Sequence, residues 1–160
     1  MFNRVKSTYQ RYRMKFTCEI EIGLPVSRVV ELFDNIDNLK LWQPGFVSFE
    51  PLSGTPGEAG AKARLKYVMG KREIEMIETI TVKDLPREFS GTYEAKGVWN
   101  EVKNYFIPLD EHRTLYKTEN DFRFSGFMKI IGFLMPGAFK KESMKYLVQF
   151  KDFAEKAGPA

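Results

Sequence analysis

The sequence predicts a single α+β domain in which a curved antiparallel sheet of about seven strands packs around one long C-terminal helix. Three observations lead there. A chain of 160 residues with 43% hydrophobic side chains has the size and composition of one globular domain. Its middle part alternates apolar and polar residues in short segments separated by turns. From Ser125 onward the period becomes helical. We expect the domain to span 14–157.

Charge gives little evidence of a polyanionic partner, because the net charge of +4 comes from the first thirteen residues. Residues 1–13 carry Arg4, Lys6, Arg11 and Arg13 and no acidic side chain, whereas the rest of the chain is balanced. We read 1–13 as a basic N-terminal extension, with contact to nucleic acid or to an anionic membrane as the less favoured alternative. No nucleic-acid partner is expected.

The first strand is predicted over 14–22, where one face is apolar and the other is polar. Pro25 ends it and begins a short helix, PVSRVVELFDN, with Val26, Val29, Val30 and Phe33 on the inner side. A second short helical turn, IDNLKLW, follows, with Asp34 or Asp37 as its cap.

Six further strands follow in the segments FVSFEPL, AKARLKYVM, KREIEMIETITVKDLP, EFSGTYEA, VWNEVKNYFIPL and TLYKTENDFRF. The turns between them include SGTPGEAGA, Gly70-Lys71, Lys96-Gly97 and the DEHR turn. Strands joined by short turns indicate an antiparallel meander.

The last segment is predicted to be helical from Ser125 to Ala157 with a kink at Pro136. Its first half is apolar on nearly all sides, so we expect it to be buried. Its second half puts Met144, Leu147, Phe150 and Ala154 on one stripe. The apolar stretch 124–139 is too short for a membrane span, which needs about twenty residues, and it contains Lys129.

This order of elements, with PVSRVVELFDNIDNLKLWQPGF near the start, GxxGAKARLKY and the closing LVQFKDFAEK, resembles the START-like (SRPBCC) superfamily of polyketide cyclases/dehydrases and lipid-transport proteins. The resemblance covers about 14–157. It implies the helix-grip (START/Bet v 1-like) fold and an internal cavity for a hydrophobic ligand. An apolar concavity with a few polar groups is the usual form of such a site.

Glu78 is the leading candidate site residue, because alternation places it with Ile74, Met76, Ile80 and Val82 on an apolar face. A carboxyl there would bind a ligand hydroxyl or act as a general base with a raised pKa. The alternative is that a bulge in this long strand turns Glu78 toward solvent.

A polar ladder on the next strands is the second candidate. Asn100 and Asn104 alternate with Val98, Val102 and Phe106, and the following strand places Tyr116, Thr118 and Asn120 on one face. If that face looks into the cavity, these side chains, with Tyr67 and Tyr93, orient a ligand by hydrogen bonds. The alternative is that the face carrying Trp99, Tyr105 and Ile107 is the buried one.

Apolar lining residues are predicted from position alone. Trp42 and Phe46 border the second short helix, where the resemblance implies the cavity entrance. Helix residues Phe127, Ile130, Ile131, Leu134 and Met135 are those most able to line the interior. At such spacing these residue types are more often plain core.

The rare residue types argue against several kinds of enzyme. The one histidine, His112, lies in the DEHR turn, which excludes His-based triads and makes a histidine-rich metal site improbable. Cys18 alternates inward with Phe16 and Ile20, so we expect an inert buried thiol and no intrachain disulfide. No dinucleotide or P-loop motif is present. We therefore expect no metal and no cofactor.

The leading hypothesis for function is binding or transport of a hydrophobic small molecule, such as a lipid, an isoprenoid or a polyketide-like compound. One alternative is a cyclase or dehydratase that uses Glu78 or a cavity tyrosine as acid or base. Another is a non-catalytic interaction module. We expect a cytoplasmic protein, monomeric or dimeric, because the N-terminus lacks the features of a secretory signal.

Overall fold

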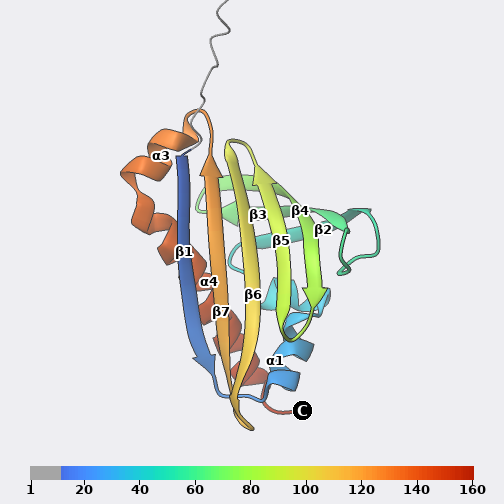
Figure 1. Ribbon diagram of the computed structural model, residues 1–160. Helices are drawn as coiled ribbons and strands as arrows, with labels where there is room; N and C mark the ends of the chain where they lie inside the picture. Colours follow the sequence, from blue (N-terminus) through green and yellow to red (C-terminus); the bar gives the residue numbers. More distant parts are fainter. Residues whose placement is uncertain (1–11) are drawn as a thin grey trace, which may run out of the picture.

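The computed structural model describes residues 12–160, so the arm at 1–11 lies outside the described residues. The strands are β1 (Tyr12–Ile22), β2 (Phe46–Ser53), β3 (Lys62–Met69), β4 (Arg72–Asp84), β5 (Glu88–Ala95), β6 (Val98–Asp110) and β7 (Arg113–Phe124). They form one antiparallel sheet in the order β1-β7-β6-β5-β4-β3-β2 (Figure 1). The predicted meander is confirmed, and β1 begins two residues earlier than expected.

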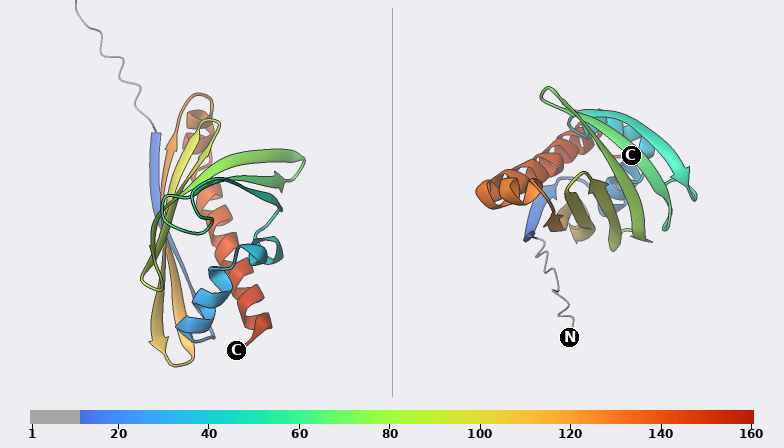
Figure 2. Two further views of the ribbon diagram at one scale, coloured as in Figure 1. Left: turned by 90° about the vertical axis from the view of Figure 1, so that its right-hand side faces the viewer. Right: turned by 90° about the horizontal axis from the view of Figure 1, so that it is seen from above.

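Between β1 and β2 lie α1 (Val26–Phe33), the short 3-10 helix η1 (Ile36–Asn38) and α2 (Leu39–Trp42). The predicted cap is wrong, since the Asn35 side chain accepts a hydrogen bond from the Asp37 backbone N–H at 3.0 Å. Two further helices close the chain, α3 (Met128–Leu134) and α4 (Pro136–Ala157). The sheet curves so that α1, α2 and α4 lie on its concave side (Figure 2).

The long C-terminal helix is broken where a kink was expected. Met135, at φ −129° and ψ 53°, separates α3 from α4, and Pro136 occupies the first turn of α4, where its missing N–H costs nothing. The predicted stripe is confirmed for Leu147, Phe150 and Ala154, which are fully buried. The expectation that the first half is buried is wrong, because Phe127, Ile130 and Leu134 are exposed.

An aromatic cluster fills the concave side near α1. Phe33 and Phe150 approach each other at 5.6 Å, and Phe150 lies 5.0 Å from Trp42 and 5.6 Å from Tyr116. These edge-to-face contacts are favourable beyond the burial of area alone. The aromatic cluster consists of Phe33, Trp42, Phe89, Phe106, Tyr116 and Phe150.

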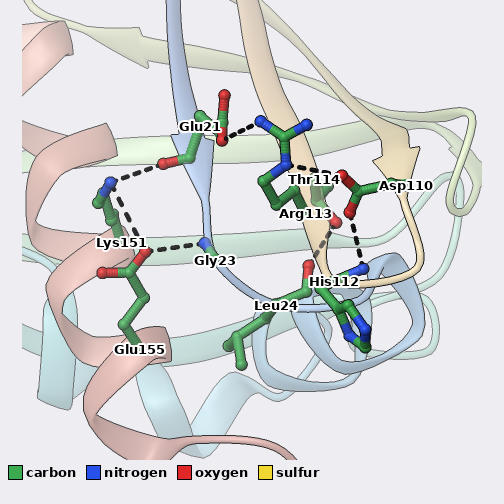
Figure 3. A network of polar contacts seen from close by, with 9 residues as sticks. All are labelled: Glu21, Gly23, Leu24, Asp110, His112, Arg113, Thr114, Lys151 and Glu155. Atoms are coloured by element: carbon green, nitrogen blue, oxygen red, sulfur yellow. Dashed lines mark hydrogen bonds and ion pairs between the residues drawn. The ribbon is translucent and has the colours of Figure 1, made fainter.

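Polar contacts tie the C-terminal end of α4 to the end of β1 (Figure 3). Lys151 donates to the backbone carbonyl of Glu21 at 2.8 Å, and the Glu155 carboxylate accepts from the backbone N–H of Gly23 at 2.8 Å. Next to them, Arg113 pairs with both Glu21 and Asp110. This network closes the end of the molecule that carries the aromatic cluster.

Gly132 sets how closely α3 packs on β7. A Cβ at this position would lie 2.9 Å from Cδ2 of Phe124, whose side chain is completely buried. Replacing Gly132 by Ala has two opposite effects on the free energy of unfolding. The higher helix propensity of Ala adds about 1 kcal/mol, and the overpacking against Phe124 removes about 1–3 kcal/mol. We expect a net loss of stability in urea unfolding. The matched control is Gly137→Ala, whose Cβ meets no atom within 4 Å. A stabilised Gly132→Ala protein would show that α3 does not pack as described.

Candidate functional site

Three polar side chains lie in one row across the concave face, on three neighbouring strands. Glu78 of β4 pairs with Tyr93 of β5, and Tyr93 pairs with Asn100 of β6. Side chains directly opposite one another on adjacent strands are close enough to interact. We call these three residues the polar row.

The surroundings of the polar row are apolar. On one side the next row contains Ile80, Gly91 and Val102, and on the other side lie Ala95 and Val98. The polar row is thus an isolated group of hydrogen-bonding side chains on an apolar surface. This placement excludes the alternative that Glu78 faces solvent through a shift in strand parity.

The bulge that the sequence analysis considered does exist, but it lies beyond Glu78. The register between β4 and β5 shifts between Ile80 and Val82. Val82 is therefore turned outward and exposed, and its predicted place on the inner face is wrong. Glu78 keeps the inward parity because it precedes the shift.

Burial raises the pKa of the Glu78 carboxyl, and a hydrogen bond with Tyr93 offsets part of this effect. The side chain retains some contact with solvent although protein surrounds it. The pKa of Tyr93 is also raised, first by burial and then by the charge of Glu78. The Tyr93 hydroxyl therefore stays protonated and is a permanent donor.

Replacing Glu78 by Gln gives a pH-dependent change in stability. Because the folded-state pKa lies above the ordinary value of 4.5, the charged carboxylate destabilises the folded protein as pH rises through that window. Below 4.5 the carboxyl is protonated in both states and has no such effect. We expect Glu78→Gln to gain stability over the wild type between pH 4 and pH 8, measured by urea unfolding.

The control for that prediction is Glu73→Gln, which removes an exposed carboxylate from the same strand. Glu73→Gln shows how much stability changes when a carboxylate is lost from the surface, so any larger pH-dependent change in Glu78→Gln is due to the burial of Glu78. A stability difference between wild type and Glu78→Gln that stays constant with pH would contradict the raised pKa.

Two buried polar atoms near this face have no hydrogen-bond partner among the described residues. They are Oδ1 of Asn100 and Nε1 of Trp42. An unsatisfied buried acceptor or donor costs about 1–3 kcal/mol. Asn100 thus offers an acceptor, next to the donor hydroxyl of Tyr93, to any molecule that reaches the polar row.

Residues from α2 and α4 join the site beside the polar row. The Tyr67 hydroxyl donates to Oε1 of Gln43 at 2.6 Å. The pKa of Tyr67 is raised by burial and then by Tyr146 and Glu78, which places all of these groups in one electrostatic environment. Burial also raises the pKa of Tyr146, to about 12.

Gln43 and Tyr146 are site residues that the sequence analysis missed. Tyr146 precedes the buried Phe150 by four positions, so helical spacing could have placed it on the inner face. No comparable signal marks Gln43, which ends α2 and reaches Tyr67 only through the tertiary fold.

Another set of predicted residues satisfies its hydrogen bonds within the core. The Tyr116 hydroxyl donates to Oδ1 of Asn104 at 2.8 Å, and Nδ2 of Asn104 donates to the Phe89 carbonyl at 2.9 Å. Nδ2 of Asn120 donates to Thr118 at 3.2 Å. These four buried side chains face inward, as the ladder interpretation required, but they are not brought together with Glu78.

The predicted apolar lining residues have different positions. Trp42 is part of the aromatic cluster, Phe46 packs edge-to-face on Tyr67 at 5.8 Å, and Met76 is half-buried two residues from Glu78. In contrast, the exposed α3 residues Phe127, Ile130 and Leu134 do not line the interior. Ile131 is half-buried.

Two hollows formed by the described residues lie on the outer face of the sheet, and neither lies between the sheet and α4. One, of about 440 Å³, is lined mainly by Arg87, Tyr105, Ile107, Pro108, Lys117 and Glu119. The other, of about 370 Å³, is lined mainly by charged side chains that include Arg13, Lys103, Asp121 and Arg123. The expected internal cavity is not one of these hollows, and the polar row is what marks the inner face as a candidate site.

Metal and thiol chemistry find little support in the described part of the chain. Within 12–160 no three His, Cys, Asp or Glu side chains gather as a metal site requires. His112 is exposed in its turn. Cys18 is buried, and burial raises the pKa of its thiol, which disfavours the reactive thiolate. None of the helices in 12–160 is long and apolar enough to cross a bilayer.

Solved structures with the same fold include an aromatase/cyclase and norcoclaurine synthases. A conserved protein from Geobacillus kaustophilus matches with a TM-score of 0.76 at 18% identity, covering 90% of this chain and 97% of that one. The Zhui aromatase/cyclase from Streptomyces sp. R1128 matches with 0.75 at 15%, covering 93% and 100%. A norcoclaurine synthase from Thalictrum flavum matches with 0.69 at 12%, covering 92% and 97%.

No protein-family model matches the sequence, and no curated protein matches it. The likeness to solved structures confirms the helix-grip fold that the sequence predicted. At such low identity it establishes the fold and leaves function to the site.

Proposed function

We propose that this protein binds a hydrophobic small molecule against the concave face of its sheet, with one polar group of the ligand directed at the polar row. The observation that carries the proposal is the row itself, Glu78, Tyr93 and Asn100, on an otherwise apolar surface. Apolar walls with a few convergent polar groups are the usual composition of small-molecule sites.

The hydrogen-bonding groups indicate what the polar part of the ligand must offer. Oδ1 of Asn100 needs a donor. The Tyr93 hydroxyl has one hydrogen, which it donates to the ligand when the Glu78 carboxyl is protonated and itself donates to the Tyr93 oxygen. A hydroxyl group on the ligand satisfies both requirements, because it donates one hydrogen bond and accepts others. An alcohol or phenol with an apolar body is therefore the favoured class, which includes sterols and phenolic polyketides.

Native mass spectrometry of the protein as purified, with and without added compounds, tests the proposal. We expect a discrete adduct, or a mass shift when a sterol or a polycyclic phenol is added, and denaturing extraction then identifies what was bound. A bare polypeptide mass with every compound in a panel of fatty acids, sterols and polyaromatics would overturn the proposal. A cytoplasmic location, which we also propose, suits the single buried thiol.

Catalysis is the second candidate, and one observation favours it. A carboxyl with a raised pKa beside a tyrosine hydroxyl is suited to general acid or base chemistry near neutral pH. The neighbours in fold include an aromatase/cyclase and a norcoclaurine synthase. Glu78→Gln distinguishes the two functions, since an enzyme would lose turnover and keep binding.

A further inference from the structure

The helix α3 and the residues at its two ends, Phe127 and Met135, carry the most exposed group of large apolar side chains in the described chain. Phe127, Phe133 and Leu134 are 71%, 70% and 67% exposed, and Met135 and Ile130 follow at 55% and 52%. We call these five side chains the α3 patch. Single exposed apolar side chains are common on protein surfaces, but a contiguous group of this kind marks an interaction site.

The helix α3, which carries most of the α3 patch, lies at one end of the molecule and is held there by packing contacts (Figure 1). Gly132 packs tightly on the buried Phe124, and Met128 packs on Gly97. The Tyr12 ring meets Phe133 edge-to-face at 6.2 Å. The rest of the domain therefore packs against only one side of this apolar helix, and the other side is exposed to solvent.

Along the chain, the charged residues next to the α3 patch are basic. Between Asp121 and Glu142 the chain contains four basic residues and no acidic one. Lys140 and Lys141 are exposed in the first turns of α4, next to the patch in sequence. An anionic surface complements this arrangement.

We propose that the α3 patch is a docking surface for an anionic lipid bilayer, with its apolar side chains inserted at the headgroup level and the lysines facing lipid phosphates. Seven residues of helix span about 10 Å, so α3 lies in the interface and does not cross the bilayer. Buried apolar area and attraction to anionic lipid both contribute to such binding.

A second copy of the chain fits the same surface less well. A two-fold interface would place the lysines of one copy against those of the other, because the same patch faces itself. Stable interfaces also use about 20–30 residues on each side, far more than the α3 patch provides. Docking to a bilayer requires no bound ligand, so this proposal goes beyond the proposed function and stands independently of it.

Flotation of the full chain with vesicles tests the docking surface without added ligand. We expect binding to vesicles of 70% phosphatidylcholine and 30% phosphatidylserine, weaker binding to pure phosphatidylcholine, and a loss at high salt. The double variant Phe133→Glu/Leu134→Glu should reduce the partition coefficient at least about tenfold, because burying an apolar side chain of this size contributes about 1.5–3 kcal/mol.

The matched control is Ile107→Glu/Leu109→Glu, which adds the same charge at exposed apolar positions near the opposite end of β6. We expect it to bind vesicles within about twofold of the wild type, with circular dichroism confirming that both variants are folded. Three results would overturn the proposal: no binding of the wild type to anionic vesicles, an equal loss in both double variants, or a dimer in sedimentation that Phe133→Glu/Leu134→Glu dissociates while vesicle binding is absent.

Discussion

Replacing Phe150 by Ala is expected to remove about 3–5 kcal/mol from the free energy of unfolding, the usual cost of a buried phenylalanine. Phe150 is completely buried, and its ring contacts Phe33, Trp42 and Tyr116 in the aromatic cluster. The variant leaves a cavity where α4, α1 and the sheet meet, because rings held from several sides cannot move in to fill it. Urea unfolding measures the loss.

Phe127→Ala is the matched control, since it removes the same ring from a position that is 71% exposed. We expect a change within about 0.5 kcal/mol there, as for most surface substitutions. A loss below about 1 kcal/mol for Phe150→Ala would show that the aromatic cluster is not a tightly packed core.

A ligand pair that differs in one group tests the polar row. 2-Naphthol and 2-methylnaphthalene share the same rings and differ by a hydroxyl in place of a methyl group. Each hydrogen bond contributes about 0.5–1.5 kcal/mol, so two bonds at the polar row predict that the wild type prefers the naphthol by about tenfold. Calorimetric or NMR titration measures both affinities.

Asn100→Leu removes the free acceptor while keeping a side chain of similar length. We expect this variant to lose most of the preference for 2-naphthol and to retain its affinity for 2-methylnaphthalene. Thr92→Val is the matched control, because Thr92 neighbours Tyr93 on β5 and points to the opposite face of the sheet. Equal affinity of the wild type for both compounds, or an unchanged preference in Asn100→Leu, would count against the polar row as a binding group.

Alternation was sufficient to predict the sheet, because each strand has one apolar and one polar face and short turns leave few ways to connect them. It also placed Glu78, Asn100 and Asn104 correctly on the inner face. It failed at Val82, where the bulge depends on pairing with β5: Gly91 has no side chain there, and a Cβ would lie 3.1 Å from the Thr79 carbonyl. Such cross-strand constraints are not visible along one strand.

The helix α3 shows a different limit. A segment that is apolar on nearly all sides is normally buried. In contrast, α3 is exposed because the chain breaks at Met135 and one side of the helix packs on the fold, through Gly132 on Phe124 and Phe133 on Tyr12. Likewise, the sequence identifies inner polar residues without showing which have partners. Tyr116 satisfies Asn104, whereas Oδ1 of Asn100 has no partner in 12–160, and only the three-dimensional arrangement separates them.

We propose the concave face around Glu78, Tyr93 and Asn100 as the ligand site. Titration of the ¹⁵N-labelled protein with 2-naphthol tests it most directly, by mapping which backbone amides shift. The account predicts that the largest shifts lie at these three residues and their neighbours on β4, β5 and β6. Shifts concentrated instead at Tyr105 and Lys117, in the outer hollow, or on the α3 patch would contradict it.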